Sequence, residues 1–233
     1  MRMKEYTRNI AKTIKSKYLN SSGFHTDRKI VVIESDDWGS IRMPSKKTYE
    51  SLVKLGDNCS QDAFLRYDSL ERLQDLKQLF EVLRQYKDKN GKHPCITANY
   101  AVANPNFDLI KPQEKYYAYE PFTVTYENYY GNSSDIMREI QVGIKEHCFY
   151  PQLHCREHMN VTRWMKDLHD GKEDVQIAFS KKMIGIGSSF SKQNYFGYMD
   201  ALNYDSANEL YVLRNIIVDA ATIFKNIFGY SSK

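Results

Sequence analysis

The stretch IVVIESDDWGS, residues 30–40, decides the fold. Its first four residues are a β-branched run of the kind that forms a fully buried strand. Carboxylates follow at once, among them Asp36 and Asp37. The carboxyl end of a buried strand is where α/β barrels and open parallel sheets place their chemistry. We therefore predict an α/β protein with a functional site just after residue 33.

Strand and helix patterns alternate along the rest of the chain. The order predicts parallel strands joined by helical crossovers. The expected elements are a helix over 68–86 opened by a capping box of Asp68 and Glu71, a strand over 95–102, an aromatic-rich connection over 107–131 too polar and irregular for a helix, a helix over 135–147, a strand over 149–153, helices over 161–169 and 174–182, and a long helix that ends at Gly229.

Composition narrows the classes of function. A length of 233 residues with 42% hydrophobic content supports one substantial core. A net charge of +4 is too mild for the whole protein to be a nucleic-acid binder, so no nucleic-acid partner is expected. The four cysteines form no CxxC pair and no apolar run is long enough to span a bilayer. We therefore expect a soluble cytoplasmic protein with reduced thiols.

The first 22 residues are expected to form a separate basic amphipathic helix, before a main domain over 23–233. Tyr6, Ile10, Ile14 and Tyr18 recur at a spacing of four, with lysines and arginines around them. Two interpretations remain open. Residues 1–20 make weak contact with an anionic membrane surface, or the helix packs on its own domain with a solvated basic face.

His154 and His158 are spaced so that both imidazoles can bind one metal ion. With Glu157 they also satisfy H-x-x-E-H, a zinc-peptidase pattern in which the glutamate is the general base. That pattern requires a continuous helix. Pro151 and the extended character of 149–153 place His154 at the end of a strand instead, so the peptidase is the minor alternative.

Asp36 and Asp37 leave a strand as neighbours and point in different directions. One carboxylate can therefore bind a cation while the other stays free beside it. The alternative is an Asp-Asp pair that only forms a turn or caps a helix, unrelated in space to the histidines. Both motifs fall at strand ends, which favours the metal site.

These two motifs resemble those of the polysaccharide deacetylase (NodB-homology) family. Ser35-Asp36-Asp37-Trp38-Gly39 is similar to the family's first motif, and His154-Cys155-Arg156-Glu157-His158 is similar to its second. The resemblance implies a distorted (β/α) barrel and a hydrolase that removes acetyl groups from an N- or O-acetylated carbohydrate. It also implies that Asp36 is the catalytic base and that Asp37, His154 and His158 bind a divalent metal, Zn first, with Co, Ni or Mn as alternatives.

The resemblance covers residues 30–160. The family's later motifs, including a histidine that acts as general acid, have no counterpart here. The chain also stops four residues after a helix ends, where another strand would begin. We therefore expect a partial barrel that lacks its C-terminal strands. An inactive metal-binding relative is then an alternative to a working deacetylase.

Overall fold

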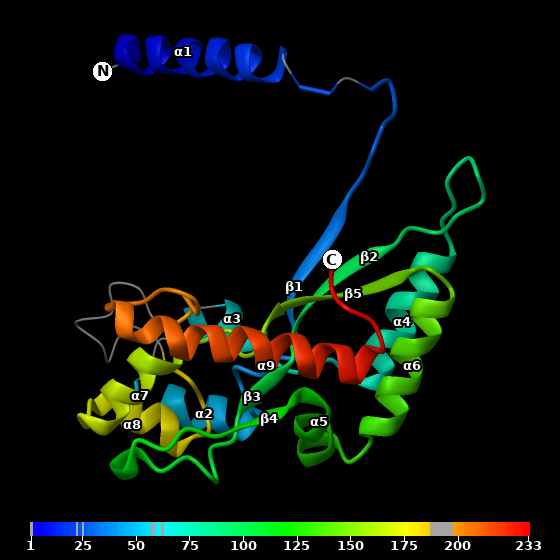
Figure 1. The fold of residues 1–233 in the computed structure, drawn as a ribbon. Coiled ribbons are helices and arrows are strands. Elements are labelled where there is room, and N and C mark those ends of the chain that lie inside the picture. The colour runs from blue at the N-terminus through cyan, green and yellow to red at the C-terminus, as the bar shows by residue number, and fades with distance from the viewer. Residues whose placement is uncertain (1, 22, 25, 57–58, 62, 187–197) are drawn as a thin grey trace. The chain divides into compact units, whose positions relative to one another are not determined.

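The computed structural model describes residues 2–21, 23–24, 26–56, 59–61, 63–186 and 198–233. The chain divides into two compact units, Met1–Val32 and Ile33–Lys233 (Figure 1). The first unit contains one helix, α1 (Arg2–Ser21). In the second, the described residues form a mixed α/β structure with a three-stranded parallel sheet.

The sheet contains β1 (Ile33–Trp38), β2 (Ile96–Ala101) and β5 (Phe149–Cys155) in the order β1-β2-β5. Both pairings are parallel. This confirms the α/β class and the two later strands: β2 lies within the predicted range 95–102, and β5 extends two residues beyond the predicted end at 153. Because the strands are parallel and adjacent, their carboxyl ends meet at one edge of the sheet.

The prediction of a fully buried strand over residues 30–33 is wrong. Ile30, Val31 and Val32 are 59%, 84% and 71% exposed, and β1 begins only at Ile33. Ile33 pairs with Ile96, the first residue of β2. In a parallel register Val31 would pair with Pro94, which has no N–H group to donate. The ladder therefore starts late, and the aspartates lie inside β1 rather than after it.

One face of the sheet is covered by helices. Helices α4 (Leu73–Arg84) and α6 (Ser133–Lys145) lie side by side in Figure 1, and together with the end of α9 (Leu210–Phe228) they pack on this face. The shared core contains strand residues from alternate positions and large helix side chains: Ile96, Ala98, Tyr100, Phe149, Phe80, Ile136, Ile140, Phe224 and Phe228.

The intervening strand positions point to the opposite face, because successive side chains of a strand alternate. Thr97 and Asn99 of β2 and Tyr150 and Gln152 of β5 are all partly exposed. This second face of the sheet is therefore polar and partly open.

The predicted start of the helix over 68–86 is also wrong. Helix α4 begins at Leu73, where the Asp75 carboxylate accepts a hydrogen bond from the Arg72 N–H at 2.8 Å. Asp68 instead forms an ion pair with Arg42, and Glu71 accepts a hydrogen bond from the Tyr100 hydroxyl. Both acids have long-range partners, so neither opens the helix.

The aromatic-rich segment 107–131 is more regular than predicted. It contains a 3₁₀ turn, η2 (Pro112–Glu114), strand β4 (Tyr119–Pro121) paired with β3 (Ala103–Pro105), and helix α5 (Phe122–Tyr130). The prediction of no helix there is wrong. Phe122 and Tyr126 are fully buried one turn apart, so burial of the aromatic rings selects the helix.

The last helices agree with the sequence analysis. They are α7 (Val161–His169), α8 (Glu173–Ser180) and α9, which a short 3₁₀ turn, η3 (Ala207–Glu209), precedes. Gly229 closes α9 in the left-handed conformation, as predicted. Between β1 and α4 the chain also forms α2 (Lys46–Lys54), η1 (Cys59–Gln61) and α3 (Ala63–Tyr67), for which no element was expected. Among the described helices, none combines the length and the apolar character needed to cross a bilayer.

Candidate metal centre

Asp37 lies at a bulge in β1. Ser35 is opposite Ala98 and Trp38 is opposite Tyr100, so β1 contains one residue more than β2 between these pairs. Asp37 has a φ of 65°, in the left-handed region that aspartate tolerates better than most residues. Such a bulge redirects a side chain out of the regular alternation. It turns the Asp37 carboxylate toward the end of the sheet.

His154 also lies at a bulge. Leu153 is opposite Tyr100 and Cys155 is opposite Ala101, which leaves His154 as the extra residue of β5. His158 follows in the bend after the strand. Residues 154–158 therefore do not form the continuous helix that the peptidase pattern needs.

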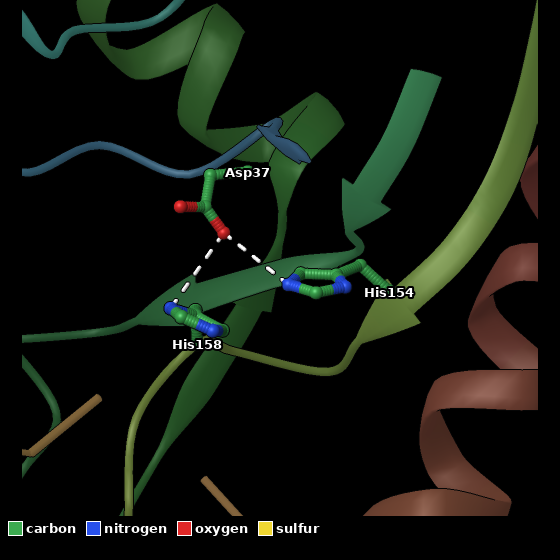
Figure 2. A group of neighbouring side chains, drawn as sticks. All are labelled: Asp37, His154 and His158. Atoms are coloured by element: carbon green, nitrogen blue, oxygen red, sulfur yellow. Dashed lines mark ion pairs between the residues drawn. The ribbon is translucent and has the colours of Figure 1, made fainter. Parts of the chain in front are cut away.

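The structure brings Asp37, His154 and His158 together (Figure 2). One carboxylate oxygen, Asp37 Oδ1, lies 3.5 Å from His154 Nε2 and 3.6 Å from His158 Nδ1. The two imidazole rings stack with centroids 4.9 Å apart. One ligand atom from each residue lies within 4.8 Å of the others.

This spacing fits a small divalent cation. Tetrahedral zinc with bonds of about 2.0–2.1 Å to N and O ligands holds those atoms about 3.3 Å apart. Asp37 Oδ1 and His158 Nδ1 are buried and make no hydrogen bond to any described residue. Buried polar atoms without partners are costly, and a cation would satisfy both. The His154 side chain is 30% exposed, which leaves one side of the group open.

An arginine that the sequence analysis missed orients Asp37. Arg42 Nη2 donates to Asp37 Oδ2 at 2.6 Å, and Arg42 Nε lies 3.1 Å from Asp68 Oδ2. One Asp37 oxygen is thus held by Arg42 while the other faces the histidines. Burial raises the pKa of Asp68 to about 6, against the opposing effect of Arg42.

His158 is suited to bind a metal as the neutral imidazole. Burial lowers its pKa, and the nearby His154 and Arg42 add to this, although Asp37 acts in the opposite direction. A lowered pKa keeps the ring nitrogens free of the extra proton that would compete with a cation.

The loop after Asp37 is held by Asn104, which is 2% exposed. Its Nδ2 donates to the Gly39 carbonyl at 2.8 Å, and its Oδ1 accepts from the Ile41 N–H at 3.1 Å. Gly39 has a φ of +76°, and a Cβ there would lie 2.6 Å from the Ala101 carbonyl oxygen. Glycine is therefore required at the turn that follows Asp37 and Trp38.

Asp36 lies beside the three-residue group rather than in it. Its Oδ1 accepts a hydrogen bond from Asn99 Nδ2 at 2.7 Å, on the polar face of the sheet. Asp36 and Asp37 both line a pocket of about 330 Å³, whose other lining residues include Trp38 and Tyr67. Asp36 therefore lies next to a candidate ligand with its carboxylate bound by Asn99, and its role as a base stays a prediction.

Glu157 belongs to a buried network. Its two oxygens accept hydrogen bonds from Arg156 at 2.6 and 2.8 Å, and Tyr117 donates to one of them at 2.6 Å. Arg156 also donates to Asp219 of α9 at 2.9 Å. Burial alone would lower the pKa of Arg156, but the hydrogen bonds and charge of Glu157 outweigh it and raise that pKa. Both Glu157 oxygens are occupied and the side chain is 2% exposed, so it is not available as a general base.

The sequence analysis missed Arg42, Asp68, Asn99 and Asn104. Asn99 carries the one usable signal, because an amide in the middle of a predicted strand of a parallel sheet needs a partner wherever it is buried. The other contacts depend on how separate loops meet, which leaves no periodic pattern.

Comparison with known protein families, with curated proteins and with solved structures gave no match. The site is therefore interpreted from its own geometry.

Proposed function

We propose that Asp37, His154 and His158 bind a divalent cation, for which Zn²⁺ is the leading candidate. We also propose that the protein removes acetyl groups from an N- or O-acetylated carbohydrate by hydrolysis. One observation carries the proposal. Buried atoms of Asp37 and His158 that lack hydrogen bonds face each other beside a partly exposed His154, at the spacing of metal ligands.

Such a cation would polarise the acetyl carbonyl and lower the pKa of a neighbouring water molecule. Asp36 would accept the proton as water attacks, and Asn99 would hold that carboxylate in position through its hydrogen bond. Arg42 would keep the second Asp37 oxygen away from the reacting groups.

The pocket next to the group supports a carbohydrate substrate. Carboxylates such as Asp36 accept hydrogen bonds from sugar hydroxyls, and the exposed ring of Tyr67 would offer a face on which a sugar ring stacks. A concave site with a few converging polar groups is the general form of a small-molecule site.

We also propose that the sheet is part of a distorted, incomplete (β/α) barrel. Parallel strands with helices packed on one face are the arrangement that a barrel wall would have. The four cysteines are all free thiols, which supports a reducing compartment and hence the cytoplasm.

The metal is tested by measuring bound zinc per chain after dialysis. Wild type should retain about one ion, and His154→Ala and Asp37→Asn should lose most of it. His169→Ala is the matched control, because that ring bonds the Pro112 carbonyl elsewhere in the fold. Equal zinc content in all four proteins would refute the metal site.

The reaction is tested by acetate release from acetylated chito-oligosaccharides with saturating Zn²⁺. Asp36→Asn should lower the rate by about 10²- to 10⁴-fold, the usual effect of removing a general base. Glu157→Gln should cost far less, because that side chain is buried in its network. A larger loss in Glu157→Gln, with peptide cleavage, would favour the peptidase instead.

An inactive metal-binding protein is the second candidate. Nδ1 of His93 and Nδ1 of His169 each bond a backbone carbonyl, and in the part of the chain that the structure describes no contact with Asp37, His154 or His158 marks either ring as a general acid. Metal retention without acetate release would select this alternative.

A further inference from the structure

The positive charge of the chain is concentrated in its first unit. Residues 1–32 contain eight lysines and arginines against two acidic residues, whereas the remaining chain contains 25 against 27. The first unit therefore accounts for all of the net charge of +4, and the second is slightly acidic. Such asymmetry indicates a partner with negative charge for the first unit.

Helix α1 has an apolar stripe on one side, and its basic residues lie outside this stripe. At about 100° per residue, Ile10, Ile14 and Tyr18 fall within about 80° of one another on the helix surface. Their side chains are 43%, 63% and 77% exposed. The helix therefore presents an apolar stripe in which large side chains are open to the solvent.

Basic residues border this stripe. Lys17 lies about 20° from Ile10 at one border, and Lys15 and Arg8 lie about 60° and 80° beyond Tyr18 at the other, whereas Lys12 lies on the opposite face. All four are exposed. Lysines at the borders of an apolar stripe can extend their charged ends to a surface while their stems cover apolar groups.

We propose that α1 binds in the plane of an anionic lipid bilayer, with Ile10, Ile14 and Tyr18 inserted and the flanking basic side chains on the lipid phosphates. Peripheral helices bind in this way when an apolar face and a basic face adjoin. A nucleic-acid duplex would use the basic residues but leave the apolar stripe without a role. The inference does not depend on the proposed hydrolase.

The test uses the full chain with vesicles of phosphatidylcholine containing about 30 mol % phosphatidylglycerol, and of phosphatidylcholine alone. Co-sedimentation should show binding to the anionic vesicles and little to the neutral ones. Raising the salt from 0.1 M to 1 M, which shortens the Debye length from about 10 Å to about 3 Å, should weaken it strongly.

Two variants separate the two faces. Lys15→Gln with Lys17→Gln should weaken binding by roughly 25-fold, at about five-fold for each basic charge near the surface. Ile14→Asp should weaken vesicle binding by at least about ten-fold, because an apolar side chain inserted into the bilayer is replaced by a charged one. Lys87→Gln with Lys89→Gln removes the same charge from exposed positions in the second unit and should leave binding unchanged.

Several results would overturn the proposal. The first is binding to neutral vesicles that is as strong as binding to anionic ones. The second is a loss of vesicle binding in the Lys87/Lys89 control as large as in the α1 lysine variant. The third is unchanged vesicle binding with Ile14→Asp. Tighter binding to duplex DNA than to vesicles would identify a nucleic-acid helix. Lower thermal stability in the α1 variants, without vesicle binding in wild type, would show that α1 packs on its own chain. Zinc content should be the same in all variants, so failure here is distinct from failure of the metal site.

Discussion

Asp37 forms an ion pair with Arg42 through one carboxylate oxygen and offers the other as a candidate metal ligand. Its backbone also lies in the left-handed region. Its φ of 65° costs a non-glycine residue roughly 1–2 kcal/mol, less for aspartate than for most. The bulge in β1 and the Arg42 contact hold it there. Strain of this kind at a predicted site is consistent with a functional constraint on the conformation.

Replacing Asp37 by glycine and by alanine separates strain from charge. Both variants lose the carboxylate and should lose metal, but only glycine adopts a positive φ without cost. Chemical denaturation should therefore show Asp37→Gly to be more stable than Asp37→Ala by about 1 kcal/mol. Equal stabilities would mean that the backbone at this position is not strained.

Asp68 should make stability depend on pH. Its pKa rises from 3.8 when unfolded to about 6 when folded, so its stabilising contribution is fully present below 3.8 and is lost as the pH rises through about 6. The free energy of unfolding of wild type, relative to Asp68→Asn, should thus fall between about pH 4 and about pH 6. Urea titrations at several pH values measure this, and a difference that rises over the interval would contradict the burial of Asp68.

At the scale of elements, α4 and α6 meet through a glycine. A Cβ on Gly143 of α6 would lie 2.5–2.9 Å from three ring atoms of Phe80 in α4. The two helices therefore approach more closely than any larger residue would allow. Phe80 in turn packs on Phe149 of β5, with ring centroids 5.5 Å apart.

Gly143→Ala should accordingly destabilise the protein. Alanine favours a helix over glycine by about 1 kcal/mol, but overpacking against Phe80 costs typically about 1–3 kcal/mol. Thermal unfolding should show a lower Tm for Gly143→Ala. In the background of Phe80→Leu, which makes room, the same substitution should be neutral or stabilising. A higher Tm in the single variant would show that the ring moves freely.

Elements whose patterns are periodic and locally capped could be predicted. Helix α7 coincides with the predicted range, because Asn160 caps it and its buried face is regular. The errors arose where long-range partners override local signals. The pairing of β1 with β2 begins only at Ile33, because Pro94 lies in the segment that Val31 would pair with. Asp68 binds Arg42 and does not cap a helix. No local pattern contains that information.

At the scale of the second unit, its last helix contacts the loop between the two candidate histidine ligands. Asp219 of α9 accepts hydrogen bonds from Arg156 and from the Tyr119 hydroxyl. Arg156 in turn holds Glu157, the residue before His158. Contacts of this kind behind metal ligands fix their orientation.

Asp219→Asn should therefore weaken zinc binding by about 10- to 100-fold, as is usual for residues that support metal ligands. Competition with a chelating dye measures the affinity. Lys225→Gln, an exposed change on the same helix, is the control and should leave the affinity unchanged. Asp219→Glu should restore part of it. Unchanged affinity in Asp219→Asn, despite a lower Tm, would limit the network to a structural role.

Much of the candidate site could be predicted because its ligands come from two short motifs at strand ends. Asp37, His154 and His158 meet as expected. The two bulges that aim Asp37 and His154 could not be predicted, because a bulge depends on the register with a neighbouring strand. Arg42 and Asn104 belong to loops whose meeting only the folded chain defines.

Asn104 has a thermodynamic consequence for any cation that reaches the centre. Its hydrogen bonds to Gly39 and Ile41 keep the turn after Asp37 ordered through protein contacts alone. Binding of a cation would then order few additional residues. Calorimetry should therefore record a heat-capacity change of binding close to zero, unlike the large negative value of a segment that folds on binding. Asn104→Ala should convert that small signal into a large one.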